Sequence, residues 1–191
     1  MNILALNSKS VCICRPDTSL NKENEDFYVP EDIEYIGWTP VLYARICKAG
    51  KAVQPEFADR YYDSIAFGVF LHPSSQTKMG KAHFCTGRCS VFDRSTLLPY
   101  PLYGKLTLTS SENRFSVKVK TEEVFNCTME GMQQKIEEAI VACSRHTSVR
   151  IGDFVAVELA PVQILTTRND GDSALEASFC DNNVIDIRII Y

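Results

Sequence analysis

The segment Pro40-Val-Leu-Tyr-Ala-Arg-Ile46 determines how the rest of this sequence is interpreted, because it is apolar at almost every position. A strand with one solvent-facing side would alternate apolar and polar residues. A nearly continuous apolar run instead indicates a strand that is buried on both faces. The sequence therefore predicts a central strand over 40–46 that needs cover on each face.

A short helix and a second strand are expected directly after this segment. Pro55 suits a first helical position, and apolar residues then recur every four positions up to Ile65, which predicts a helix over 55–65. Residues 66–71 are typical of another buried strand. The stretch 76–95 has two glycines and no clear period, so we expect it to be irregular.

The second half of the chain combines one amphipathic helix with several strands. Alternation over 115–119 predicts a half-buried strand. An apolar stripe opposite a polar face predicts a helix over 129–145, with Thr128 as its N-cap and Glu130 in its first turn. Further strands are expected over 154–159, 162–165 and 184–190, with a turn over 169–172. Strands outnumber helices without a regular βαβ alternation, so the fold class is α+β.

Composition and charge exclude some classes of function. The 191 residues are expected to form a single domain, 1–191, and 45% hydrophobic with 23% charged residues is ordinary for a globular protein. The net charge of -4, with scattered Lys and Arg, argues against nucleic-acid binding and against a membrane surface. Residues 1–20 lack the pattern of a signal peptide, so a cytoplasmic location is expected.

The cysteines are expected to be buried free thiols, because apolar residues flank most of them and no export signal is seen. A zinc site formed by His83, Cys85 and Cys89 is the less favoured alternative, since no second ligand cluster with suitable spacing exists. The eight positions are 12, 14, 47, 85, 89, 127, 143 and 180.

Several motifs carry a resemblance when they are taken in order along the chain. They are Arg15-Pro-Asp-Thr-Ser-Leu20, Arg45-Ile46, Arg60-Tyr-Tyr-Asp-Ser-Ile65, Phe92-Asp93, Ser144-Arg-His-Thr-Ser-Val-Arg-Ile-Gly-Asp-Phe-Val-Ala156 and Asn183-Val-Ile-Asp-Ile-Arg-Ile189. In this order and spacing the chain resembles the fumarylacetoacetate hydrolase family over nearly its whole length. The resemblance implies a strand-rich, mixed β-sheet roll with two or three short helices, a fold linked to aromatic catabolism.

The resemblance also implies a chemistry that this sequence does not support. Members of that family hydrolyse, isomerise or decarboxylate small diketo or 2-oxo acids with Mg²⁺ or Mn²⁺, which a Glu-x-Glu pair and a later Asp hold. The corresponding positions here are Thr39, Val41 and Phe70, none of which is a carboxylate. Thr39 offers one neutral oxygen at most. We therefore expect no bound metal cofactor and no metal-dependent activity.

Other positions that match the family's functional residues also differ. The family's active-site histidine segment has no counterpart in 1–10, and its lysine before Phe-Asp is Ser90 here. Its small-residue loop for a substrate carboxylate corresponds to 157–161, where Glu158 places a negative charge. Arg15 keeps the positive charge of the matching lysine.

Three other groups have both a functional and a structural interpretation. Arg45 in the predicted buried strand needs a partner, either an internal salt bridge to Asp63 or an anion in a remnant cleft. An acidic run over 31–34 is expected to be a solvated edge rather than a metal site. Asp153, which follows a glycine, is expected to have a structural role in a tight turn.

Together these features favour a divergent, non-catalytic binding or regulatory protein of this fold. The alternatives are an active hydrolase or isomerase with displaced ligands, and an interaction module that pairs with an active paralogue. Expected partners are a small 2-oxo or diketo acid and a second subunit, in a homodimer or a paralogue heterodimer. The candidate residues of a remnant cleft are Arg15, Thr39, Val41, Arg45, Phe70, Ser90 and Glu158.

Overall fold

The computed structural model describes residues 1–78 and 81–191, and most of its regular structure is strand. The larger sheet contains β1 (Ile3–Leu6), β2 (Cys12–Arg15), β3 (Leu20–Asn21), β5 (Tyr35–Ile46), β6 (Tyr62–Ser74), β9 (Thr96–Leu97), β10 (Tyr103–Gly104), β13 (Phe154–Glu158) and β14 (Gln163–Thr167). Its order is β2-β1-β13-β5-β6-β9-β3, with β14 beside β5 and β10 beside β6. Both parallel and antiparallel pairs occur in it.

The smaller sheet has the order β12-β11-β15-β16-β4. Its strands are β4 (Phe27–Tyr28), β11 (Arg114–Val119), β12 (Glu122–Thr128), β15 (Ser173–Phe179) and β16 (Asn182–Ile190). Two short strands, β7 (Thr77–Lys78) and β8 (Lys81–Ala82), pair with each other in a separate two-stranded sheet. The helical elements are α1 (Thr86–Cys89), α2 (Met132–Ser144) and the 3₁₀ turns Asp17–Ser19, Pro55–Arg60 and Lys105–Thr109.

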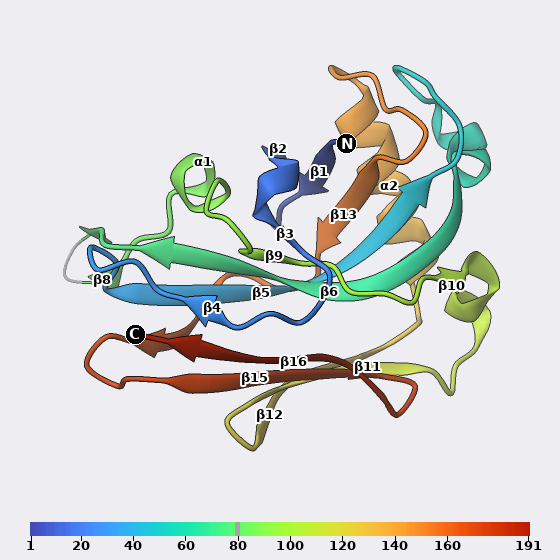
Figure 1. Ribbon diagram of the computed structural model, residues 1–191. Helices are drawn as coiled ribbons and strands as arrows, with labels where there is room; N and C mark the ends of the chain where they lie inside the picture. The colour runs from blue at the N-terminus through green and yellow to red at the C-terminus, as the bar shows by residue number, and fades with distance from the viewer. Residues whose placement is uncertain (79–80) are drawn as a thin grey trace.

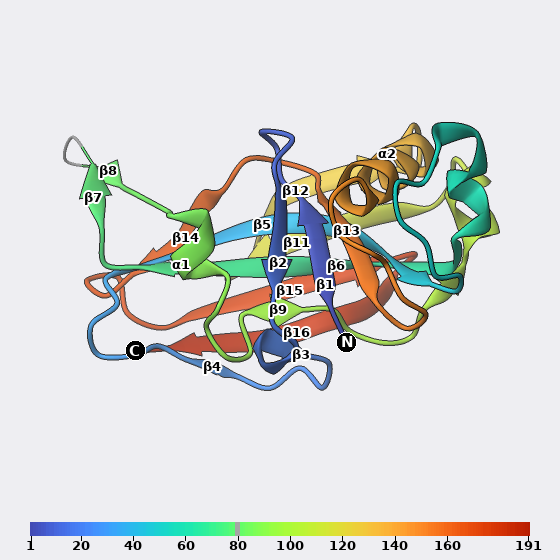
Figure 2. The ribbon, with the colours of Figure 1, turned by 90° about the horizontal axis from the view of Figure 1, so that it is seen from above.

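The two sheets form layers, and the larger one curls. In Figure 1, β5 and β6 lie above the smaller sheet, and β13, β1 and β2 rise from them on the opposite side. Seen from above, β1 and β2 run across the direction of β5 and β6 (Figure 2). The predicted α+β class with strand-rich mixed sheets is confirmed.

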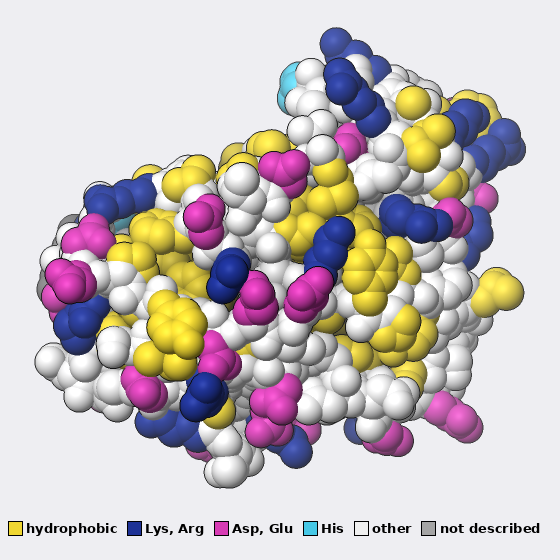
Figure 3. Space-filling model, viewed as in Figure 1, with side chains coloured by type: hydrophobic (Ala, Val, Ile, Leu, Met, Phe, Trp, Pro, Cys, Tyr) yellow, Lys and Arg dark blue, Asp and Glu magenta, His cyan; other side chains and the backbone are white. Residues whose placement is uncertain are grey.

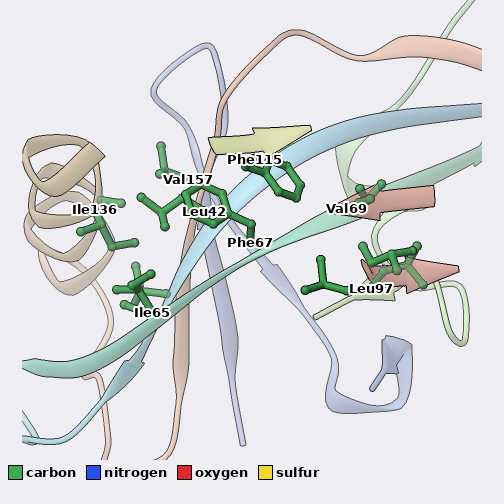
Figure 4. Close-up of a cluster of buried hydrophobic side chains, with 14 of the residues drawn as sticks. Leu42, Ile65, Phe67, Val69, Leu97, Phe115, Ile136 and Val157 are labelled. Carbon is green, nitrogen blue, oxygen red and sulfur yellow. The ribbon is translucent and has the colours of Figure 1, made fainter. Parts of the chain in front are cut away.

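The paired strands β5 and β6 are buried on both faces, as the apolar run over 40–46 predicts. They pair antiparallel along almost their full length, from Tyr35 opposite Ser74 to Ile46 opposite Tyr62. One row of side chains faces the smaller sheet, where Phe67 stacks on Phe115 with ring centres 4.8 Å apart (Figure 4). Side chains on the two faces alternate because strand residues point to opposite sides in turn.

The opposite face of β5 and β6 packs against other parts of the same chain. Val41 and Phe70 lie there in a second apolar cluster with Ile3, Ala5 and the neighbouring strand β13. The cover that the central strand requires is therefore supplied within one chain. The predicted dimer stays a prediction, because covering this strand does not require a second subunit.

Pro40 of β5 lies at the gap between β13 and β14, the two strands that pair with the same edge of β5. Strand β13 pairs with 41–45 of β5, and β14 pairs with 35–38, so Pro40 lies opposite neither. Because proline has no N–H to donate, it fits a strand position where no ladder bond is needed. Strand β13 ends at Glu158, and the N–H of the next residue, Leu159, still donates to the Pro40 carbonyl at 2.9 Å before the chain leaves β5.

Two helix predictions need correction. The helix predicted over 55–65 is a 3₁₀ turn, Pro55–Arg60, and Ile65 already belongs to β6, because pairing with β5 begins at Tyr62. The long helix begins at Met132 rather than 129, with Gly131 in place of Thr128 as its N-cap, at φ 70°. Glu130 therefore lies outside its first turn. Its predicted apolar stripe is confirmed as buried, at Met132, Ile136, Ala139, Ile140 and Cys143.

Most predicted strands are confirmed, and several strands were not predicted. Strand β11 covers 115–119, and β13, β14 and β16 match the three strands expected near the C-terminal end. The short strand β1 and the seven-residue strands β12 and β15 are among the strands that were not predicted. Within 76–95 the described residues form only the short elements β7, β8 and α1, close to the irregular structure predicted. No helix in the described residues is long and apolar enough to cross a membrane.

The cysteine prediction is correct in part. All eight are free thiols, and Cys89 and Cys143 are buried. Cys12, Cys14 and Cys85 are exposed, which corrects the expectation of burial for them. Cys12 and Cys14 lie on β2, an edge strand of the larger sheet that pairs with β1, and both are on exposed positions of that strand.

Candidate functional site

Four of the seven predicted cleft residues converge on one face of the larger sheet. In the strand register, Thr39 of β5 lies opposite Phe70 of β6, and Val41 lies opposite Glu158 of β13. Residues that lie opposite each other in paired strands share a face. The spacing of Thr39 and Val41, two residues apart, puts both on that face.

Arg15, the fifth residue, reaches this face from β2 and is completely buried. Its Nη1 donates to the Ser95 carbonyl at 3.0 Å and to Thr96 Oγ1 at 2.8 Å, and its Nη2 donates to the Leu71 carbonyl at 2.9 Å. The guanidinium carbon lies 4.2 Å from the centre of the Phe70 ring. Arg15 therefore links β2 to β6 and to the segment before β9.

Burial lowers the pKa of Arg15 to about 9, and the negative charge of Glu158 opposes this shift. The group therefore stays largely protonated at neutral pH. No carboxylate hydrogen-bonds to it among the described residues, and its neutral partners are oxygen acceptors and an aromatic ring. The buried cation is therefore stabilised by the carbonyl and hydroxyl oxygens that accept its hydrogen bonds, by the Phe70 ring and by the more distant charge of Glu158.

Glu158 ends β13 and is 8% exposed. Its Oε2 accepts the backbone N–H of Ser8 at 3.1 Å. Burial raises the pKa of Glu158, while the Ser8 N–H and the positive charge of Arg15 act in the opposite direction. The turn between β1 and β2 places that N–H, since Asn7 Oδ1 accepts the backbone N–H groups of Lys9 and Val11.

His72 belongs to the same face but was not predicted as a site residue. It lies on β6 two residues after Phe70, opposite Gly37 of β5, and is 3% exposed. Burial, and after it the charge of Arg15, hold the pKa of His72 well below its ordinary value, so the ring is neutral. The predicted strand ended at Leu71, and one more residue of strand would have placed His72 beside Thr39 and Phe70.

A cavity of about 280 Å³ opens beside this cluster. Its polar wall contains His72 and Glu158, and Phe84 and Val162 form part of its apolar wall. A Cβ added at Gly37 would lie 2.8 Å from both Phe84 and Val162, so the glycine allows these side chains to close over β5. The full lining is Asn7, Ser8, Lys9, His72, His83, Phe84, Glu158, Pro161 and Val162.

Three buried polar atoms of the cluster have no hydrogen-bond partner among the described residues. They are Arg15 Nε, Thr39 Oγ1 and His72 Nε2. Buried polar groups are almost always paired, so three unpaired atoms on one sheet face are unusual. One further unpaired buried atom, Ser173 Oγ, lies on β15 in the other sheet.

Arg45 and Ser90 lie outside the cluster. Arg45 is exposed and pairs with Asp63 at 3.0 Å, so the salt bridge is present but on the surface rather than internal. Ser90 is buried at the end of α1, where its hydroxyl donates to the Gly87 carbonyl at 3.1 Å. Neither hydrogen-bonds to the cluster.

The structural interpretations of the acidic groups fit the structure. Asp153 accepts the backbone N–H groups of Asn2 at 2.7 Å and Arg150 at 2.9 Å, so its carboxylate ties the turn before β13 to the N-terminus. Glu31, Asp32 and Glu34 are exposed, as predicted for a solvated edge. On the face seen in Figure 3, Lys and Arg side chains are interspersed with Asp and Glu, without a large patch of one sign.

The residues present do not fit a divalent metal at the positions that the resemblance implies. Mg²⁺ and Mn²⁺ select carboxylate and other oxygen ligands. Here the three positions offer one hydroxyl and two hydrocarbon side chains, next to a buried guanidinium that would repel a second cation. Elsewhere in the described residues, no group of three or more His, Cys, Asp or Glu is arranged to hold a metal.

Comparison with solved structures establishes the fold. No protein-family profile and no curated protein matches this sequence. A protein from Yersinia pestis assigned to the fumarylacetoacetate hydrolase family is similar with a TM-score of 0.75 and 18% identity, over 99% of this chain and 92% of that one. Fumarylpyruvate hydrolase from Pseudomonas aeruginosa, solved with Mn²⁺ and pyruvate, gives 0.79 and 15%, over 100% and 89%.

A third structure widens the range of activities found on this fold. The 5-carboxymethyl-2-hydroxymuconate delta-isomerase from Mycobacterium smegmatis gives a TM-score of 0.79 at 13% identity, over 99% of this chain and 78% of that one. The chain therefore has the fumarylacetoacetate hydrolase type of fold, as the motifs predict. One fold can host several chemistries, so the function has to be argued from the site.

Proposed function

We propose that this chain uses a fumarylacetoacetate hydrolase-type fold to bind a small molecule without a divalent metal, and that it does not catalyse the metal-dependent reactions of proteins with this fold. The observation that carries the proposal is the position of Arg15. Its buried guanidinium packs on Phe70, beside Thr39, where the resemblance implies carboxylates around a metal.

Electrostatics support this proposal. Metal-dependent chemistry on a 2-oxo acid needs a hard cation to bind the substrate and to stabilise the developing enolate. A divalent ion beside Arg15 would add two positive charges to a buried site that already holds one, without carboxylates at 39, 41 and 70 to offset them. Glu158, the acidic group nearest in the register, already hydrogen-bonds to Ser8.

The cavity beside this cluster supports a binding role. It has a polar wall with buried ionisable side chains and an apolar wall, which is the common composition of small-molecule sites. The resemblance implies a 2-oxo or diketo acid as the ligand. In this cavity the negative charge of such an acid would be repelled by the Glu158 carboxylate and attracted by the ammonium group of the exposed Lys9.

A turnover assay tests the absence of catalysis. The protein is incubated with an acylpyruvate and with oxaloacetate, in the presence of Mn²⁺ and separately in EDTA. The fumarylpyruvate hydrolase from Pseudomonas aeruginosa serves as the positive control for the Mn²⁺ arm. We expect no turnover by this chain in either arm. Turnover that EDTA abolishes would support the alternative, an active enzyme with displaced ligands.

A further inference from the structure

The cavity over His72 and Glu158 combines features that define its ligand more narrowly. We infer that it binds a small, neutral, planar molecule with a hydrogen-bond donor beside an acceptor, of which a carboxamide is the simplest example. This inference rests on the proposed metal-free function, because a metal at this site would change the charge of the ligand that fits.

The site is built from buried polar side chains rather than from surface residues. His72 is 3% exposed and Glu158 is 8% exposed, and both line the cavity. His72 Nε2 has no partner among the described residues, and neither does Thr39 Oγ1 on the same sheet face. Both atoms lie below the accessible surface, and Thr39 is outside the cavity lining, so they form a polar layer behind the cavity wall rather than direct ligand contacts.

The charges around the cavity argue for a ligand without net charge. Glu158 lines the cavity, Arg15 lies behind the lining with the opposite charge, and His72 beside Glu158 is neutral. An anion or a cation bound against the buried side chains of His72 and Glu158 would leave one charge uncompensated at the inner end of the cavity, which is expensive. The exposed lining residues Lys9 and His83 are in contact with solvent and count for less, because water screens charge there.

The hydrogen-bonding groups argue for a donor beside an acceptor. Glu158 accepts from Ser8 through Oε2, and its Oε1 accepts no hydrogen bond from the described residues, so it can take a ligand N–H or O–H. A neutral imidazole such as that of His72 provides one donor and one acceptor. A carboxamide, with an NH₂ and a carbonyl side by side, can satisfy both residues.

Size and shape set the remaining limits. The cavity volume of about 280 Å³ lies at the lower end of the range for small-molecule sites, about 300–1,000 Å³, so the cavity takes a small ligand. The apolar wall, which includes Phe84, Pro161 and Val162, offers a surface against which a flat hydrocarbon part can pack.

Three probes of the same shape and different charge test the inference. Benzamide is neutral, benzoate is an anion and benzamidinium is a cation. Each is titrated into the EDTA-treated, ¹⁵N-labelled full chain, and the amide shifts of Ser8, Phe84 and Val162 are followed. We expect saturable shifts at these amides, with benzamide the tightest. A tighter benzoate or benzamidinium would overturn the inference, as would the absence of saturable shifts with all three.

A charge-removing variant provides a second, sharper test. Glu158→Gln keeps the shape and still accepts the Ser8 N–H, but it leaves Arg15 without its balancing charge. We expect the preference to move from benzamide to benzoate, changing the ratio of their dissociation constants by about tenfold or more. Glu112→Gln, at an exposed position, should leave that ratio unchanged.

The outcomes separate this inference from the proposed function. An unchanged ranking in a folded Glu158→Gln variant would contradict the role of Glu158. If that variant does not fold, the ranking of the three probes in the unaltered protein still decides the inference. All arms contain EDTA, so a metal-binding result bears on the proposed function alone.

Discussion

The guanidinium carbon of Arg15 lies 4.2 Å from the centre of the Phe70 ring, inside the protein and without solvent contact. Phe70 is one of three positions at which the resemblance implies a metal-binding residue, and Thr39 lies opposite it in the next strand. A fixed organic cation and two hydrocarbon side chains thus occupy the region where a metal cradle is expected.

Arg15 should matter far more to stability than a surface arginine. Arg15→Met removes the donors for the buried carbonyls of Leu71 and Ser95, so we expect a loss of about 2–4 kcal/mol in the free energy of unfolding. Arg45→Met, which breaks only the exposed pair with Asp63, should cost less than about 1 kcal/mol. Urea denaturation of both variants measures the difference. Equal losses would show that the Arg15 contacts do not form.

His72 should make the protein less stable as pH falls. The unfolded chain binds a proton at this imidazole below about pH 6.5, whereas burial holds the folded pKa well below that value. The unfolded state therefore binds more protons between the two pKa values, and stability is lost as pH drops through that window. Above the unfolded pKa both states are neutral and the contribution is constant.

The measurement compares His72→Asn with the unaltered protein at pH 7 and pH 5. The raised pKa of Glu158 acts in the opposite direction, since its folded form gains protons more readily, but it is present in both proteins and cancels in the comparison. We expect a smaller drop in Tm for His72→Asn. His146→Asn, at an exposed position, should behave like the unaltered protein. Identical drops for all three would refute burial of a neutral His72.

Gly68 should tolerate no side chain. Strand β9 passes so close to β6 that a Cβ at Gly68 would overlap the carbonyl oxygen of Leu97. We expect Gly68→Ala to cost about 1–3 kcal/mol through overpacking. Gly104→Ala is the matched control, because its Cβ would meet nothing within 4 Å and its φ of -61° is ordinary. Thermal unfolding distinguishes them, and a neutral Gly68→Ala would contradict the β6–β9 register.

Substitutions at the start of α2 distinguish the predicted N-cap, Thr128, from the observed one, Gly131. Gly131→Ala places a Cβ on a residue with φ 70°, which should cost about 1–2 kcal/mol. Thr128→Ala, which removes the cap that the sequence predicts, should change stability by less than about 0.5 kcal/mol. Chemical denaturation checks both. A larger effect at Thr128 would mean that the helix begins where the sequence predicts.

The sequence predicts those helices and strands whose apolar residues recur at a regular period within one segment. The apolar run over 40–46 and the stripe of α2 each bury residues at a regular period, and both predictions are confirmed. Strand β15 was missed because its inward residues include the small Ala177, which carries little hydrophobic signal. Arg45 looked buried because the run continues to Ile46, but the cover on its face ends before it, and its side chain reaches solvent.

The site was predictable to the extent that strand alternation and the resemblance define it. These place Thr39, Val41 and Phe70 together, and the register confirms this arrangement. The depth of Arg15, the proximity of Ser8 to Glu158 and the inclusion of His72 depend on pairings between residues far apart in the chain, such as Ser8 with Glu158. No local pattern encodes such pairings.

Calorimetric titration of the EDTA-stripped protein with Mn²⁺ tests the central claim most directly. The fumarylpyruvate hydrolase from Pseudomonas aeruginosa provides a positive control, since it has been solved with that ion. We expect no binding heat for this chain beyond dilution. One-site binding tighter than about 100 μM, roughly -5.5 kcal/mol, would contradict it and show that ligands other than those at 39, 41 and 70 hold a metal.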